Sequence, residues 1–280
     1  MSNDLRCGKF RLSLERPLIM AIVNVTPDSF SDGGRYFDLG QASDHARRLV
    51  DEGADILDIG GESSRPGAEP VSEDVELQRV MPLIERLENL GVPLSVDTVK
   101  PGVMRRALAG GASMINDINA LRTPGAIEAV AGSGAAVVLM HMQGEPRTMQ
   151  RDPHYADVVG EVRQFLAMRI AAVHDAGIAR ECIVVDPGFG FGKLLDHNLA
   201  LLRDLARFAE LGCPVLAGMS RKSMLQGFSS RPMQQRLPAS LAAALIAVQN
   251  GAAIVRVHDV AETRDALAVW SAVKARARAS

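Results

Sequence analysis

The chain has 280 residues, of which 47% are hydrophobic, and carries 31 basic against 33 acidic side chains. A formal net charge of −2 gives no case for a nucleic-acid or anionic-membrane partner, which would need a basic face or stripe, so we expect neither. No apolar run approaches the roughly 20 residues of a membrane span, and the N-terminus lacks the apolar core of a signal peptide. Three cysteines without paired spacing, Cys7, Cys182 and Cys213, are typical of a reducing cytoplasm.

The sequence alternates short β-branched apolar runs with longer segments of helical period. A hairpin is expected within residues 8–14. Eight runs then follow, and their nearly continuous hydrophobicity is typical of parallel strands buried on both faces. They cover residues 18–26, 54–61, 93–99, 113–120, 135–141, 182–188, 214–220 and 252–259. Helical segments lie at 41–53, 72–90, 155–177, 196–212, 237–251 and 260–278, most of them ending at a glycine suited to a left-handed C-cap.

This alternation predicts an α/β protein with a (β/α)8 TIM-barrel fold. Eight strand–helix units in about 260 residues fit such a barrel better than a doubly wound sheet, which usually has about five to seven strands. No linker or change in composition divides the chain. We therefore expect residues 1–280 to form one domain, with residues 1–17 as a short N-terminal β-hairpin extension.

The helix at 237–251 is apolar nearly all round, although an outer barrel helix should carry a polar face. Two explanations remain open for this helix. Its small residues can pack tightly between neighbours, or its outer face can be buried in an oligomer.

Active sites of barrels lie at the C-terminal ends of the strands. The predicted strand ends carry carboxylates and amides suited to a donor-rich heterocycle, and cations suited to an anion. These residues are Asn24, Asp58, Asp97, Asn116 or Asp117, His141, Asp186, Ser220, Arg221, Lys222, Arg256 and His258.

Several familiar motifs are excluded. The sequence GFGFGK at 188–193 lacks the first glycine and the Ser/Thr of a phosphate-binding P-loop, and it does not open a dinucleotide-binding unit. The sequence GMSRK at 218–222 has Lys222 where a nucleophile elbow needs glycine. No cluster with metal-ligand spacing is present, so a tightly bound structural metal is not expected.

Four segments are dense in candidate functional residues. The loop NVTPDSFSDGG at 24–34 is longer than a minimal strand–helix connection, and GGESSRPGA at 60–68 places Ser64 and Arg65 after a glycine pair. VDPGFGFGK begins at Val185 and contains two phenylalanines that either plug the core or stack on a ligand. GMSRK and RVHD end the last two strands, so Lys222, Arg256 and His258 should converge where barrels commonly bind phosphate.

Eight motifs, in this order and spacing, closely resemble those of the dihydropteroate synthase family. They are NVTPDSFSDGG, GGESSRPGA, SVDT, INDI, MHMQG, DPGFGFGK, GMSRKS and RVHDV. The resemblance implies the joining of 6-hydroxymethyl-7,8-dihydropterin pyrophosphate to p-aminobenzoate, with release of pyrophosphate and 7,8-dihydropteroate and with help from Mg²⁺. It also implies a homodimer, and competition by sulfonamides at the p-aminobenzoate subsite. One departure is Ser64, where the family often has threonine.

The resemblance also implies roles for individual residues. The pterin-binding set is Asp97, Asn116, Met140, Asp186, Phe191 and Lys222. The pyrophosphate set is Asn24, Ser64, Arg65, Arg256 and His258, with Asn24 as a metal ligand. The p-aminobenzoate set is Phe30, Ser64, Pro66, Lys222 and Ser223. The catalytic set is Arg65, Lys222, Arg256 and His258, which would stabilise a departing pyrophosphate without a covalent nucleophile.

Two alternatives remain. A pterin-dependent methyltransferase domain would share the barrel and the pterin pocket, but it has no pyrophosphate to hold and leaves the Ser64–Arg65 and Arg256–His258 groups unexplained. A non-catalytic paralogue that binds pterin is disfavoured by the intact motifs, but the sequence alone does not exclude it.

Overall fold

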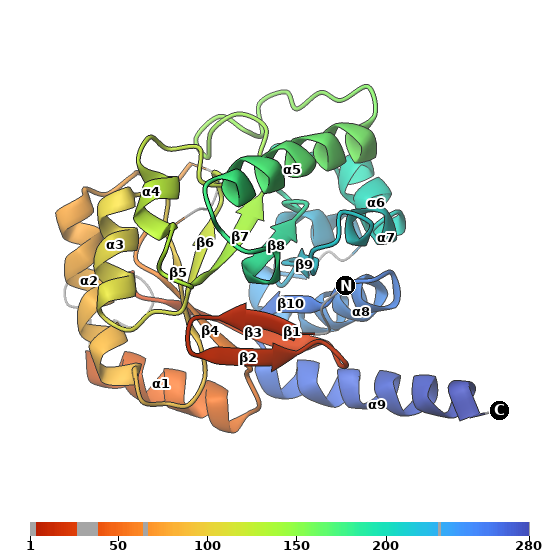
Figure 1. Ribbon diagram of the computed structural model, residues 1–280. Coiled ribbons are helices and arrows are strands. Elements are labelled where there is room, and N and C mark those ends of the chain that lie inside the picture. The colour runs from red at the N-terminus through yellow and green to blue at the C-terminus, as the bar shows by residue number, and fades with distance from the viewer. Residues whose placement is uncertain (1–3, 27–38, 64–66, 229–230, 280) are drawn as a thin grey trace.

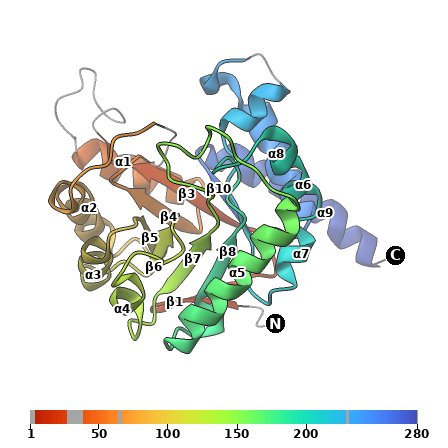
Figure 2. The same ribbon diagram turned by 90° about the horizontal axis from the view of Figure 1, so that it is seen from above.

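The computed structural model describes residues 4–26, 39–63, 67–228 and 231–279, and within them eight parallel strands form the predicted barrel. The strands are β3 (Leu18–Asn24), β4 (Ile56–Gly60), β5 (Leu94–Asp97), β6 (Met114–Asp117), β7 (Ala136–Met140), β8 (Ile183–Asp186), β9 (Leu216–Ala217) and β10 (Ile254–Val257). Their order is β8-β7-β6-β5-β4-β3-β10-β9, and a parallel bridge between Val185 and Val215 joins the two ends. Viewed from above, the helices surround the strands (Figure 2). The predicted TIM-barrel fold is confirmed.

The helices mostly follow the predicted segments. They are α1 (Leu39–Asp51), α2 (Glu73–Leu87), α3 (Pro101–Ala109), α4 (Ala126–Val130), α5 (Val158–Asp175), α6 (Leu195–Arg203), α7 (Ala206–Ala209), α8 (Leu237–Gln249) and α9 (Val260–Ala279). Two of them, α3 and α4, were not among the predicted helices, because nine- and five-residue helices are too short to show a clear helical period. The predicted helix at 196–212 is divided into α6 and α7. Asp204 leaves the helical conformation there, and the Asn250 side chain donates to the carbonyl of Leu202.

The predicted N-terminal hairpin is present and closes one end of the barrel (Figure 1). Strand β1 (Asp4–Cys7) pairs antiparallel with β2 (Phe10–Ser13). Leu5 and Cys7 are fully buried against apolar residues from the barrel interior. These interior residues are Leu18, Met20, Ile56, Met114, Ala136, Val138, Val184, Leu216 and Ile254. The hairpin therefore plugs the N-terminal end of the barrel and leaves the C-terminal end for a ligand.

Side chains alternate along each barrel strand between two apolar clusters. In β4, Leu57 and Ile59 pack in the larger cluster, which includes buried residues of the surrounding helices, whereas Ile56 packs inside the barrel. The same alternation places Asp58 on the inner face, one step nearer the C-terminal end. The interior thus changes from apolar at the hairpin end to polar at the opposite end.

Helix α8 buries a face of small residues, Ser240, Ala243, Ala244 and Ala247, together with Val248. This supports tight packing as one reason for its composition, while its outward Ile246 remains 44% exposed. Of the helices in the described part of the chain, none combines the length and apolar character of a bilayer span.

Candidate active site at the C-terminal end of the barrel

Arg256 joins two carboxylates at the polar end of the barrel. Its Nε donates to Asp58 Oδ2 over 2.6 Å, and its Nη2 donates to Asp97 Oδ2 over 3.0 Å. Asn116 donates its side-chain amide to the same Asp58 oxygen over 2.9 Å. In the strand register Asp97 lies between Gly60 and Asn116, so β4, β5, β6 and β10 all contribute to this group.

Burial and charge set the protonation of Asp97. Loss of water around its carboxyl raises its pKa from 3.8 to about 7; Arg256 opposes the rise and the nearby Asp58 adds to it. Asp58 is fully buried, and its Oδ1 accepts no hydrogen bond from the residues that the structure describes. Asp58 was among the predicted strand-end residues, but the resemblance gave it no role. The structure shows that it holds both Arg256 and Asn116.

Asp186 and Lys222 form the opposite side of the site. Asp186 Oδ1 accepts a hydrogen bond from the backbone N–H of Gly188, 2.7 Å away, and burial raises the pKa of this carboxyl. Lys222 Nζ donates to the carbonyl of Phe189 over 2.6 Å. Burial lowers the Lys222 pKa to about 8, although Asp186 favours the charged form. Lys222 can therefore change protonation near neutral pH.

An apolar wall stands beside these polar groups. Met140 and Phe191 cluster with Ile118, Met142 and Met149 at the strand ends. Met140 pairs in register with Asp186, and the Lys222 ammonium lies 4.5 Å from the centre of the Phe191 ring. A few polar groups beside an apolar wall suit a flat heterocycle whose edge carries hydrogen-bond donors and acceptors.

The loop after β9 separates two neighbouring cations. Arg221, which has a positive φ of 58°, turns outward and forms an ion pair with Asp259. Arg236 supports this loop by donating to the carbonyls of Arg221 and Lys222 over 3.2 and 3.4 Å. Ser223 follows as the first, exposed residue of a 3-10 turn (Ser223–Gly227). Of this loop's two cations, Lys222 is the one that faces the site.

His258 lies next to Ser220 at the ends of the last two strands. Its Nδ1 is 3.0 Å from Ser220 Oγ, which also accepts from the His258 backbone N–H over 3.3 Å. Asn24 is the last residue of β3, paired with Gly60. A Cβ at position 60 would lie 3.6 Å from Asn24 Oδ1, so glycine keeps space beside this oxygen.

The structure decides between Asn116 and Asp117 and removes His141 from the ring of ligand-facing residues. Asp117 accepts hydrogen bonds from the following turn, whereas Asn116 faces Asp58. His141 is buried against the ring of Phe165, and its Nδ1 is 3.0 Å from Lys193 Nζ. Lys193 also donates to the carbonyls of His141 and Phe191, so it braces the wall from behind. Sequence reasoning missed this role, because the glycine-rich motif was considered only as a phosphate loop, which was excluded, and as the source of two phenylalanines.

Four predicted site residues, Phe30, Ser64, Arg65 and Pro66, lie outside the described residues. Residues on either side of Ser64–Pro66 are described and form ion pairs and hydrogen bonds. Lys100 Nζ forms ion pairs with Glu62 Oε2 at 2.6 Å and with the buried Glu76 Oε2 at 2.5 Å. The Val71 backbone N–H donates to the same Glu62 oxygen over 2.8 Å. Among the described residues, no group of three or more His, Cys, Asp and Glu side chains could hold a metal ion.

Comparison with known proteins identifies the family to which the chain belongs. Residues 20–258 match the family model described as pterin binding enzyme, which covers most of the chain and includes every described strand-end residue discussed above. The chain is 51% identical over 262 residues to the dihydropteroate synthase of Escherichia coli (strain K12), covering 93% of both chains. The chain therefore belongs to the dihydropteroate synthase family, a group of transferases.

Solved structures agree with this assignment. The Burkholderia cenocepacia dihydropteroate synthase complexed with 7,8-dihydropteroate is 54% identical, with a TM-score of 0.91, and the match covers 99% of this chain and 98% of that one. The Xanthomonas albilineans dihydropteroate synthase with 4-aminobenzoic acid is 55% identical, with a TM-score of 0.92, over 98% and 99% of the two chains. The expected family is confirmed along nearly the whole length.

Proposed function

We propose that the strand-end site condenses 6-hydroxymethyl-7,8-dihydropterin pyrophosphate with p-aminobenzoate to give 7,8-dihydropteroate and pyrophosphate. The observation that carries this proposal is the pairing of two carboxylate acceptors, the largely buried Asp97 and the buried Asp186, with the apolar wall of Met140 and Phe191. The relatives support it, since the solved Burkholderia and Xanthomonas proteins are bound to dihydropteroate and 4-aminobenzoic acid.

The pterin ring offers amino and ring N–H donors that Asp97 and Asp186 can accept. Each such charge-assisted bond contributes about 1.5–3 kcal/mol. Asn116 can complete the edge of the ring, and Lys222 can donate to the pterin carbonyl or a ring nitrogen. Phe191 and Met140 would flank the ring faces.

Pyrophosphate gains negative charge as its bond to the pterin methylene breaks. We assign Arg256 and His258, with Ser64 and Arg65 from the loop after β4, to the stabilisation of this charge. In the structure, the Nε–H and one N–H of Nη2 in Arg256 are engaged by Asp58 and Asp97, so its action on the leaving group falls to the three remaining N–H bonds, two on Nη1 and one on Nη2. The pterin cation left behind is stabilised by resonance, and the arylamine nitrogen captures it and then loses a proton. No protein nucleophile is needed in this route.

Mg²⁺ is proposed to assist, and the residues fit a weakly coordinated ion. Asn24 would supply one amide oxygen, with space beside it kept by Gly60. The described residues present no carboxylate cluster, so pyrophosphate oxygens and water would supply the other ligands, as Mg²⁺ commonly allows. When bound, the ion would neutralise charge on the leaving group.

The p-aminobenzoate subsite is assigned to Phe30, Ser64, Pro66, Lys222 and Ser223. Of these, the described residues Lys222 and Ser223 are adjacent in the chain, and Ser223 is exposed.

Assembly and location are also proposals. We propose a homodimer, supported by exposed apolar side chains on two successive helices, Ile246 on α8 and Val269 and Val273 on α9. Sedimentation of the purified protein would test this. We propose a cytoplasmic enzyme, supported by three buried free cysteines.

The function is tested by pyrophosphate release from purified protein given the pterin pyrophosphate, p-aminobenzoate and Mg²⁺. Release should require p-aminobenzoate and match the dihydropteroate formed. Chelation of Mg²⁺ should lower release but leave binding of a dihydropterin without pyrophosphate unchanged. Folded protein that binds pterin but releases no pyrophosphate would instead be a non-catalytic paralogue.

A further inference from the structure

The turn after β6 has an unusual backbone. Ala120 and Leu121 have positive φ angles of 53° and 55°, although neither is glycine. L-residues rarely adopt this left-handed region, and two in succession are rarer still. Both residues are buried. The surrounding structure must therefore hold this turn in place.

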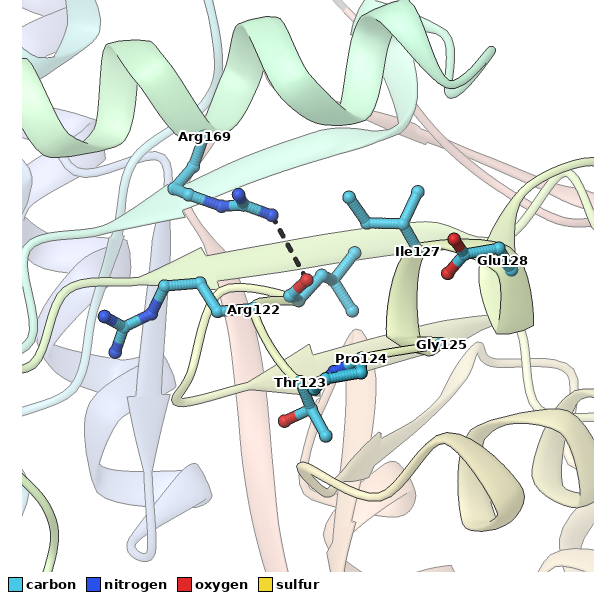
Figure 3. Close-up of a pocket in the computed structure, with 8 residues that line it drawn as sticks. Arg122, Thr123, Pro124, Gly125, Ile127, Glu128 and Arg169 are labelled. Atoms are coloured by element: carbon cyan, nitrogen blue, oxygen red, sulfur yellow. Dashed lines mark hydrogen bonds between the residues drawn. The ribbon is translucent and has the colours of Figure 1, made fainter.

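Two side chains hold the turn from opposite sides. Asp117 accepts hydrogen bonds from the backbone N–H groups of Asn119 and Leu121, over 2.6 and 2.8 Å. Arg169 on α5 donates its Nε to the Ala120 carbonyl over 2.8 Å and its Nη2 to the Leu121 carbonyl over 3.2 Å. Figure 3 shows Arg169 reaching from the helix to the Leu121 carbonyl. One guanidinium thus binds both strained residues.

A hollow lies beside this contact. It is lined by Leu121, Arg122, Ile127 and Arg169, among others (Figure 3). Arg122 adds a link between the turn and α5, because it donates to the Asn119 carbonyl over 3.1 Å and lies over the Phe165 ring.

The same turn carries part of the pterin pocket. Asn116 and Ile118 flank Asp117: Asn116 donates to Asp58, and Ile118 packs in the apolar wall with Met140 and Phe191. Because Asp117 lies between these two residues and its carboxylate is tied to the turn, a change in the turn changes the direction of both.

We propose that Arg169 is a positioning residue for the pterin subsite, which acts by holding the Ala120–Leu121 turn in its left-handed conformation. This inference rests on the proposed function. Arg169 touches no reacting atom; it fixes where Asn116 and Ile118 meet the ring. Its loss should weaken pterin binding and leave the p-aminobenzoate subsite nearly unchanged.

The test compares Arg169→Met with Arg163→Met. Arg163 is a matched control, because it lies on the same helix and also donates to a backbone carbonyl, that of Arg207. Calorimetry with the dihydropterin pyrophosphate should give a Kd about tenfold higher for Arg169→Met, from the loss of two charge-assisted bonds to the turn. Its KM for the pterin should rise in step, the KM for p-aminobenzoate should stay within about twofold, and Arg163→Met should match the wild type.

A rescue separates positioning from general damage. Glycine adopts a positive φ without strain, so Ala120→Gly added to Arg169→Met should recover much of the lost pterin affinity. Arg169→Lys, which keeps the charge but not the two-pronged geometry, should bind pterin with intermediate affinity, and it serves if the methionine variant does not fold.

The outcomes are distinct. Wild-type protein that binds no pterin would overturn the proposed function itself. Wild-type protein that binds pterin, with unchanged affinity in Arg169→Met or in a folded Arg169→Lys, would overturn the role of Arg169 alone. Equal losses in Arg163→Met, equal rises in both KM values, or no recovery with Ala120→Gly would also overturn it.

Discussion

Replacement of Asp97 by asparagine tests the pterin-binding site most directly. Asp97 Oδ2 accepts from Arg256, 3.0 Å away, and the rest of the carboxyl group is proposed to accept pterin N–H donors. The amide oxygen of asparagine can keep the bond to Arg256, but its NH₂ group would then face the pterin donors. Loss of a charge-assisted bond should cost about 2–3 kcal/mol, or roughly 30–150-fold in Kd.

Calorimetry with the dihydropterin pyrophosphate at a pH above the Asp97 pKa of about 7 measures this loss. Asp55→Asn is the matched control, because Asp55 also pairs with an arginine, Arg16, but just before β4, at the N-terminal end of the barrel. The control should bind pterin like the wild type. Unchanged affinity in Asp97→Asn would remove Asp97 from the pocket.

The pH dependence of the unfolding free energy gives a second test of Asp97. Deprotonation of this residue should strengthen pterin binding but lower the stability of the fold. Burial raises the Asp97 pKa from 3.8 to about 7, so its contribution to the unfolding free energy is fully present below about pH 4 and is lost as the pH rises through 7. Asparagine does not titrate, so that decline should be absent in Asp97→Asn. A variant that loses affinity and also shows the wild-type decline would contradict the raised pKa.

Three further results are expected. Pterin affinity should rise as Asp97 loses its proton near pH 7 and fall as Lys222 loses its proton near pH 8, so a calorimetric series that is flat with pH would contradict both shifts. Arg256→Ala should slow turnover more than it weakens binding of a dihydropterin without pyrophosphate; equal losses in the two assays would limit Arg256 to holding Asp58 and Asp97. Leu5→Ala should lower the unfolding free energy by about 2–5 kcal/mol, because it leaves a cavity in the plugged end of the barrel; denaturant titration measures this loss. Pterin affinity should stay unchanged, which would show that the two ends of the barrel are independent.

The sequence by itself determined the barrel and the end at which its chemistry lies. Strands buried on both faces must be apolar throughout, so eight such runs, six of them followed by a helical segment, specify one architecture. Polar residues at the ends of these runs then identify the site, because parallel strands bring their C-terminal ends to one side. The hairpin was also predicted, whereas the short helices α3 and α4 lacked a period long enough to detect.

Only the tertiary structure decided which strand-end side chains meet. The strand-end pattern left Asn116 and Asp117 equivalent, and only the family resemblance favoured Asn116. The structure shows Asn116 directed toward Asp58 and Asp117 toward the turn. Arg256 reaches Asp58 across 198 positions of sequence, a contact that no local pattern encodes. Periodicity fixes the face of a strand on which a residue lies, but partners across a closed barrel depend on register and on the reach of each side chain, which exist only once the chain has folded.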